Sequence, residues 1–136
     1  MKKALVLTNG LYQTSDAKTA HGLVRGSERF LIAGIIDNTQ TANKDAGELL
    51  DSTHRNIPVF ADLAAALSTI KDADTLIIGV ATVGGKLPVE MLVIIKEAIS
   101  KGLSIVNGLH DYLNEHADLV ELALKNNSIL IDIRKP

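Results

Sequence analysis

The sequence contains no cysteine and no tryptophan, and aromatic residues make up only 3% of its 136 residues. Without cysteine the chain cannot form disulfides, use a thiolate nucleophile or bind zinc through sulfur. That composition fits the reducing cytoplasm, which is the compartment we expect. The core must be built from aliphatic side chains, and the length fits one domain spanning residues 1–136.

Strong charge of either sign is also absent, because 14 lysines and arginines stand against 16 aspartates and glutamates. The charges are interspersed, so we expect neither nucleic acid nor a membrane surface as a partner. The apolar run behind Met1–Lys3 ends at Thr8, too short for a secretory signal of at least about seven apolar residues and a cleavage site. We expect no transmembrane segment. The four histidines lack the spacing of metal ligands, and we expect no metal site.

Short apolar runs alternate with segments of helical periodicity along the whole chain. The runs predict strands at 4–8, 30–36, 57–60, 76–81, 104–106 and 129–133. Helices are expected from Ser15 or Asp16 to Gly26, weakly over 41–50, after Asp62, from Pro88 to Lys101, and over 112–126 with a break near His116. This alternation predicts an α/β, Rossmann-like, doubly wound fold, with a six-stranded, mainly parallel sheet and helices on both faces.

The stretch DTLIIGVATVGGKLP, residues 74–88, is the centre of this pattern. Its apolar run is typical of a strand covered on both faces, and Pro88 suits the first position of a helix. Between them, Gly84, Gly85 and Lys86 could cradle an anion with backbone amides and an ammonium group. The alternative is a tight turn whose glycines supply positive φ angles.

The turn after the first strand lacks the G-x-G-x-x-G fingerprint of dinucleotide-binding domains. Its sequence is NGLYQTSDAKT, in which Gly10 is the only glycine, so NAD binding in the usual pose is not favoured. Lys18, Gly22 and Arg25 share one helix face, which is either a basic stripe for a ligand or a solvated surface. Asp37 ends the second strand, where an acid holds a ribose in dinucleotide enzymes, or it caps a loop. His110 follows the fifth strand, as a general base or as a capping group.

Several segments taken together resemble one family of two-domain bacterial proteins. They are Ala17–Arg25 (AKTAHGLVR), Ile35–Asp37 (IID), Ala81–Pro88 (ATVGGKLP), Asn107–Leu113 (NGLHDYL) and Asp132–Pro136 (DIRKP). The resemblance is to the Rossmann-like N-terminal domain of a former domain of unknown function, a family also known loosely by the name NAD-dependent epimerase/dehydratase. Some members are described as D-glutamate N-acetyltransferases that use acetyl-CoA. The resemblance covers the whole chain.

This resemblance implies a partner and a set of binding positions. The family's second half is a C-terminal domain of the P-loop NTPase type, and no Walker A motif occurs in this sequence. Chemistry that needs the P-loop half would therefore require that partner domain. The shared positions fall on Lys18, Thr19, Gly22, Arg25, Asp37, Gly84, Gly85, Pro88, Gly108 and His110.

Three hypotheses follow for function. The first is a nucleotide- or CoA-type ligand-binding domain, half of an acyltransferase-like enzyme, with cofactor-binding residues Lys18, Thr19, Arg25, Asp37, Gly84, Gly85 and Lys86 and with His110 as the catalytic base. Acetyl-CoA or a nucleotide is then the expected cofactor, ahead of NAD. The second is an NAD(P)-dependent oxidoreductase or epimerase domain. The third is a non-catalytic module for oligomerisation and support of a partner domain. We expect a homo-oligomer.

Overall fold

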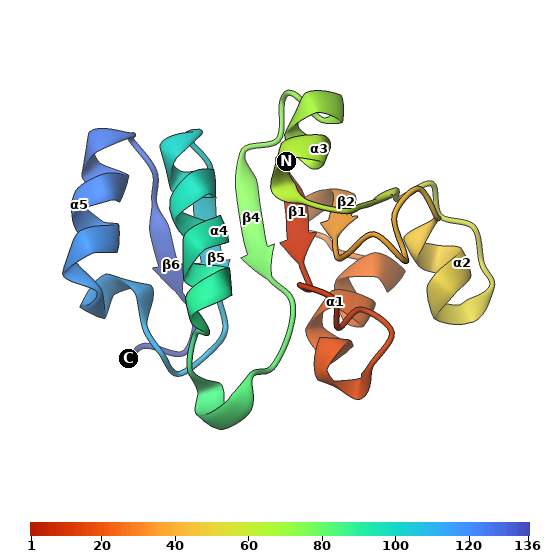
Figure 1. The fold of residues 1–136 in the computed structure, drawn as a ribbon, viewed down its shortest axis with the longest axis horizontal. Helices are drawn as coiled ribbons and strands as arrows, with labels where there is room; N and C mark the ends of the chain where they lie inside the picture. The colour runs from red at the N-terminus through yellow and green to blue at the C-terminus, as the bar shows by residue number, and fades with distance from the viewer.

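A computed structural model describes all residues, 1–136, and contains one six-stranded sheet (Figure 1). The strands are β1 (Lys2–Leu7), β2 (Phe30–Ile36), β3 (Val59–Phe60), β4 (Thr75–Ile78), β5 (Ser104–Asn107) and β6 (Leu130–Asp132). Their order is β3-β2-β1-β4-β5-β6, and every neighbouring pair is parallel. This is the strand order of a doubly wound Rossmann fold, as the sequence predicts.

The helices are α1 (Lys18–Arg25), α2 (Ala46–Asp51), α3 (Leu63–Thr69), α4 (Val89–Ser100) and α5 (Ala117–Lys125). Three short 3-10 segments, η1 (Ser15–Ala17), η2 (Val83–Gly85) and η3 (Leu113–Glu115), occur at loop positions. Crossovers between parallel strands are right-handed, so the helices that follow β1 and β2 lie on one face. Those that follow β3, β4 and β5 lie on the other, where α4 passes in front of β5 in Figure 1.

Capping residues explain most helix ends. Asp62 accepts a hydrogen bond from the Ala65 amide at the start of α3, and Gly26 and Lys101 end α1 and α4 as expected. Two predicted starts are wrong. Thr14, and not Ser15 or Asp16, caps the first turn, and Pro88 precedes the first residue of α4.

The weak helix expected over 41–50 is shorter and begins later, at Ala46. The Asp45 carboxylate accepts from the amides of Glu48, Arg55 and Ile57, so it caps α2 and also holds the strand that returns to β3. This double role fixes where the helix begins, and the polar residues before Asp45 remain a loop.

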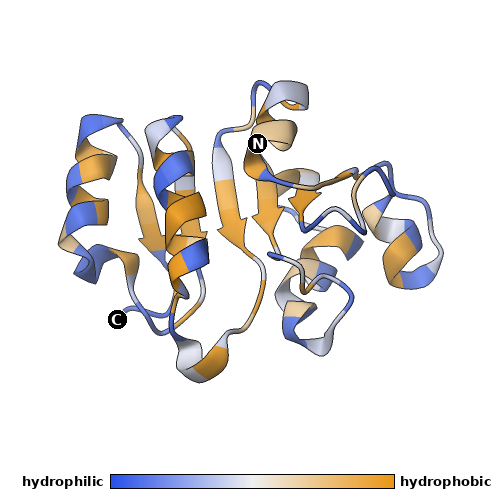
Figure 2. Cartoon of the chain, in the orientation of Figure 1, coloured by the Kyte–Doolittle hydropathy of each residue, from blue (hydrophilic) through white to orange (hydrophobic).

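The core is one continuous cluster of mainly aliphatic side chains, with Tyr12 and Phe60 as its aromatic members. Ala4, Leu5, Val6 and Leu7 of β1 have no exposed surface, and Figure 2 shows apolar strands flanked by helices with polar outer faces. Every buried side-chain nitrogen and oxygen has a hydrogen-bond partner. No helix has the length and apolar character needed to cross a bilayer. Because the order in which strands are added reverses between β1 and β4, their loops separate at the carboxyl edge and leave a crevice.

Candidate functional site

The crevice between β1 and β4 is a cleft of about 680 Å³. Its walls come from four segments far apart in sequence: the residues around the start of α1, the end of β4 with the following turn, the end of β5 with its loop, and the residues after β6. Ile77 and Val106 form an apolar floor, and Lys18, Thr19, His110 and Arg134 supply polar groups around it. Both the position and the mixed lining are typical of ligand sites in open α/β sheets.

Two backbone hydrogen bonds hold the start of α1 against β4. The Ala20 amide donates to the Gly79 carbonyl at 3.1 Å, and the Ala81 amide donates to the Asp16 carbonyl at 2.8 Å. Gly79 permits this approach, because a Cβ there would lie 2.4 Å from a Val6 methyl and 3.0 Å from the Ala20 Cβ. Lys18, the first residue of α1, thereby lies at the cleft with an exposed side chain.

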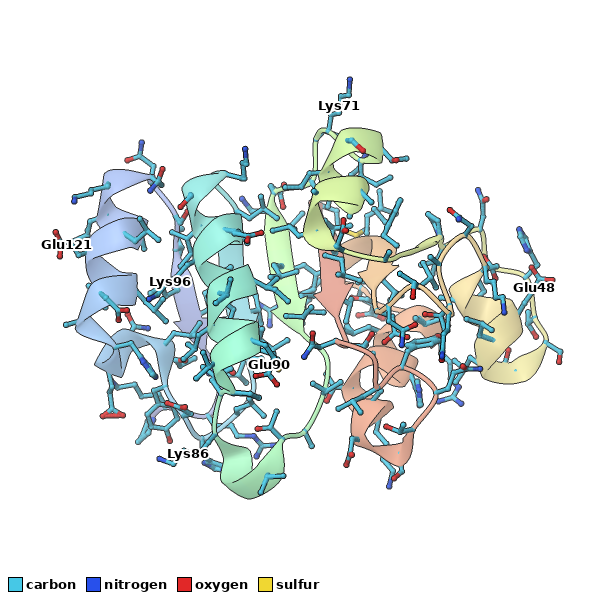
Figure 3. All side chains as sticks on the ribbon, in the orientation of Figure 1. Glu48, Lys71, Lys86, Glu90, Lys96 and Glu121 are labelled. Carbon is cyan, nitrogen blue, oxygen red and sulfur yellow. The ribbon has the colours of Figure 1, made fainter.

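The glycine pair after β4 is a tight turn. Gly84 and Gly85 have φ angles of 63° and 69°, so the turn alternative explains both glycines. The amides of Gly85 and Lys86 donate to carbonyls within the turn, and the Leu87 amide donates to Asp111. Two of the three amides expected to cradle an anion, those of Gly85 and Lys86, are therefore already bonded. Gly85 lines the cleft, whereas Gly84 and Lys86 do not, and Lys86 lies at the outer end of the turn (Figure 3).

The loop after β5 is held by a dense set of hydrogen bonds. Asn107 is buried, and its amide group donates to the Asp111 carbonyl and to Asp132 Oδ1, both at 2.9 Å. Asp132 also accepts from the backbone amides of Leu113 and Asn114 at 2.8 and 3.0 Å. Burial alone would raise the pKa of Asp132, but these donors together hold that pKa below its usual value.

An aspartate–histidine pair joins this loop to the glycine turn. Asp111 Oδ1 lies 2.7 Å from His116 Nε2, and Asp111 Oδ2 accepts from the Leu87 amide at 2.8 Å. Burial would raise the pKa of Asp111, but the Leu87 amide, His116 and the charge of Lys86 outweigh it and lower the pKa. The two loops that flank the cleft are thus fixed to each other.

His110 is the exposed member of this otherwise anchored loop. Its imidazole makes no side-chain hydrogen bond and lines the cleft, and a Cβ built on Gly85 would lie 3.7 Å from the His110 Cβ. A free imidazole on a rigid loop can accept a proton from a bound ligand without first breaking a protein contact.

Arg134 lines the cleft, although the sequence motifs did not predict a binding role for it. Its Nε donates to the Gly108 carbonyl at 2.6 Å, while the Ile133 amide donates to the Asn107 carbonyl at 2.9 Å. These bonds bring the DIRKP segment to the cleft beside His110. Ser15 and Asp16, expected only as helix caps, also line it. The parallel register of β5 and β6 was the available signal for Arg134, because it brings the ends of both strands to one edge.

Asp37 has the structural role and lies outside the cleft. The carboxylate is buried. Its Oδ1 accepts hydrogen bonds from the Thr8 hydroxyl at 2.7 Å and from the amides of Gly10 and Tyr12 at 2.8 and 3.0 Å. Its Oδ2 accepts a hydrogen bond from the Thr41 hydroxyl at 2.7 Å. The loop amides that face a pyrophosphate in dinucleotide enzymes here face an internal carboxylate. The loop-capping alternative therefore accounts for Asp37, because the carboxylate is buried and already accepts four hydrogen bonds from its own loop.

Arg25 also lies outside the cleft. It is exposed in the last turn of α1, seven residues and about 10 Å along the helix from Lys18 at 1.5 Å per residue. The basic stripe of α1 thus runs away from the cleft, and Lys18 alone represents it there.

Asp45, Glu48 and His54 form the group closest to a metal-ligand set, with candidate atoms within 4.8 Å of one another. Three backbone amides donate to the Asp45 carboxylate, and His54 lies 2.7 Å from the Glu48 carboxylate. The group is therefore explained as a helix cap beside an exposed ion pair. It lies at α2, away from the cleft.

The family model that matches the chain is DUF1611_N, a Rossmann-like domain of unknown function, over residues 39–136. The chain belongs to this family. A crystal structure of a DUF1611 family protein from Anabaena variabilis ATCC 29413 superposes with a TM-score of 0.86 and 30% identity, covering 99% of this chain and 38% of that protein. The sequence resemblance to this family is confirmed.

Two D-glutamate N-acetyltransferases are also similar to this DUF1611_N chain. The protein from Pseudoalteromonas sp. is 48% identical and that from Tritonibacter scottomollicae 38% identical, each over 64 residues. The matches cover 47% of this chain and 19% of either relative, so the relatives are much longer proteins. The NADP-bound aspartate semialdehyde dehydrogenase of Candida albicans, at 18% identity and a TM-score of 0.56, shares the fold alone.

Proposed function

We propose that this DUF1611_N domain binds an anionic ligand of the nucleotide or CoA type in the cleft, as one half of an N-acetyltransferase-like enzyme. The observation that carries the proposal is the convergence of Lys18, Thr19, His110 and Arg134, from three separate motifs, on one cleft at the β1–β4 crevice. Both D-glutamate N-acetyltransferases that resemble the chain support the reaction class.

Each group has a role that its chemistry allows. Lys18 and the free end of the Arg134 guanidinium would hold phosphate or carboxylate groups through charge-assisted hydrogen bonds, each contributing about 1.5–3 kcal/mol. The floor of Ile77 and Val106 would pack against an adenine ring or a pantetheine arm. Thr19 would donate its hydroxyl to the same anion.

His110 would act as the general base. An amine must lose its proton to attack a thioester carbonyl, and the imidazole accepts that proton as the N–C bond forms. The C–S bond then breaks, and the leaving thiolate takes the proton from the imidazolium and departs as the thiol. The acceptor amine, and any step that needs a P-loop, would involve the C-terminal partner domain that the family resemblance implies.

The NAD(P)-dependent alternative was motivated by Asp37 and by the fold, and neither observation favours it now. The Asp37 carboxylate already accepts four hydrogen bonds from its own loop, one of them from the Gly10 amide. The likeness to dehydrogenases concerns the fold, which does not determine function. We further propose the cytoplasm as the compartment, because acetyl-CoA and nucleotides are abundant there, and a homo-oligomer as the working state.

Thermal unfolding of the chain with acetyl-CoA, CoA, ATP, NAD or NADP tests the proposal. A ligand at a hundred times its Kd stabilises by about 2.7 kcal/mol, which raises the Tm of a domain this size by roughly 8–10 °C. We expect a shift with CoA-type or adenine nucleotide ligands, and its loss in Lys18→Ala and Arg134→Ala. Arg25→Ala and Lys86→Ala are matched controls that remove cations outside the cleft. A shift with NAD alone, or equal loss in the controls, would overturn the proposal, and no shift would favour the support-module hypothesis.

A further inference from the structure

A row of apolar side chains on the outer half of the sheet has no helix over it. The parallel register pairs Ile77 with Val106 and Val106 with Ile131, so these three side chains share one face. Ile129 and Ile133 lie just outside β6 but continue its pairing with β5, since the Ile105 amide donates to the Ile129 carbonyl and the Ile133 amide to the Asn107 carbonyl. Alternation therefore places both on the face of Ile131. We call these five residues, Ile77, Val106, Ile129, Ile131 and Ile133, the isoleucine shelf.

The shelf lies on the α1 face of the sheet. Val6 pairs with Ile77, and the Val6 side chain meets the same space as Ala20 of α1 above Gly79. Burial along this face falls with distance from α1: Val6 has no exposed surface, Ile77 is 4% exposed and Ile131, on β6, is 43% exposed. Ile129 and Ile133 are more exposed still.

The exposed part of the shelf is its β6 end. On β4 and β5 both faces are buried, since Ile77 and Val106 are only 4% and 5% exposed and Leu76 and Ile105, on the face of α4 and α5, have no exposed surface. β6 is also an edge strand, bonded only to β5. Exposed apolar rows on an edge strand are avoided in proteins unless something covers them, so this half of the sheet has the character of an interface.

We propose that the isoleucine shelf is where the remainder of the longer family protein docks, and that this docking roofs the cleft. The chain corresponds to 38% of the Anabaena variabilis protein, so most of that polypeptide lies outside the matched region. The shelf is continuous with the cleft, because Ile77, Val106 and Ile133 line both. The inference does not depend on the identity of the ligand.

A small ligand cannot be the occupant of the whole shelf. Ile129 and Ile133 are four residues apart in an extended segment, about 13 Å at 3.3 Å per residue. A molecule in the cleft reaches Ile133 at the carboxyl edge and leaves Ile129 uncovered, so a polypeptide surface is needed.

A second apolar groove, between α3 and α4 around Leu67 and Val93, is bordered by Lys96, Glu97 and Lys101 and shares no residue with the cleft.

The absence of cysteine allows a direct test by a single introduced thiol. Ile131→Cys and Leu31→Cys are made in this chain and in a chimera in which it replaces the matched 38% of the Anabaena variabilis protein. Leu31 is the matched control, since it is 51% exposed on β2, away from the shelf. Alkylation of each thiol is followed by peptide mass spectrometry.

We expect the thiol at 131 to react at least roughly tenfold more slowly in the chimera, a protection of about 1.4 kcal/mol, with no change at 31. Equal reactivity at 131 in both proteins would overturn the inference. Protection in the isolated chain that rises with its concentration would identify a second copy as the occupant and would also overturn it. If the chimera does not fold, the Anabaena variabilis structure decides: positions equivalent to 129, 131 and 133 must be buried by the rest of that protein, and exposure there refutes the docking.

Discussion

Asp37 gives the sharpest test of how this chain differs from a dinucleotide-binding domain. Replacing it with alanine removes the acceptor of four hydrogen bonds and leaves the Tyr12 amide buried without a partner, while the Thr8 hydroxyl keeps its hydrogen bond to the Ile36 carbonyl. The Gly10 amide and the Thr41 hydroxyl lose the same acceptor. Each amide left unpaired costs about 1–3 kcal/mol, and both threonine hydroxyls keep a second acceptor, so we expect Asp37→Ala to lose about 2–4 kcal/mol.

Asp37→Asn is the matched variant. An asparagine oxygen can replace Oδ1 and keep three acceptor contacts, and Thr41 can accept from the new amide while its hydroxyl donates to Asn38 Oδ1, so we expect a loss of only about 1 kcal/mol. Urea unfolding followed by circular dichroism measures both variants, and the alanine variant's loss would be a large part of the roughly 5–15 kcal/mol typical of domains. A loss below about 1 kcal/mol for Asp37→Ala, together with weaker nucleotide binding, would refute the structural role and restore the ribose-binding one.

Three further predictions concern packing, pH and the base. Gly79→Ala forces a Cβ to within 2.4 Å of a Val6 methyl and should destabilise the fold by about 1–3 kcal/mol or more. Gly22→Ala on α1 meets no atom within 4 Å and should stabilise the fold by about 0.5–1 kcal/mol. The urea midpoints of the two variants and of the parent chain measure both effects. The pKa of Asp132 is lowered in the folded state, so its contribution to stability is present above the unfolded value of about 3.9 and is lost as pH falls through the lower folded value. Asp132→Asn should therefore flatten the decline in unfolding free energy between about pH 5 and pH 2, and an unchanged slope would contradict the hydrogen-bond assignment. His110→Ala should leave Tm within about 1 °C, because the side chain is exposed and unbonded, while abolishing base catalysis in the complete enzyme; a large loss of stability would show that the imidazole has a structural role.

The fold could be predicted because its signals are local. Continuous apolar runs such as Leu76–Ile78 mark strands buried on both faces, and alternation with helical segments implies right-handed parallel crossovers. Caps were less predictable. Asp45 and Thr14 are chosen over their neighbours by contacts with the returning chain or by loop geometry, which periodicity does not reveal.

The site was only partly predictable for the same reason. Lys18, Thr19, Gly85 and His110 follow directly from being next to strand ends on one edge. Asp37, Gly84 and Lys86 occupy equivalent positions in sequence, yet their surroundings give them other roles: internal amides occupy Asp37, and the turn uses its own amides. Arg134 lies at the same edge because β6 is parallel to β5, but its hydrogen bond to the Gly108 carbonyl, 26 residues away, is a tertiary contact that motif spacing does not reveal.

Backbone amide chemical shifts of the labelled chain, recorded during titration with acetyl-CoA, test the central claim most directly. If three distant motifs form one ligand site, the signals of Lys18, Thr19, Gly85, Gly108 and His110 should move together with a single binding constant, and those of Asp37 and Arg25 should stay. Movement confined to the α3–α4 groove, or separate binding constants for the three segments, would contradict it.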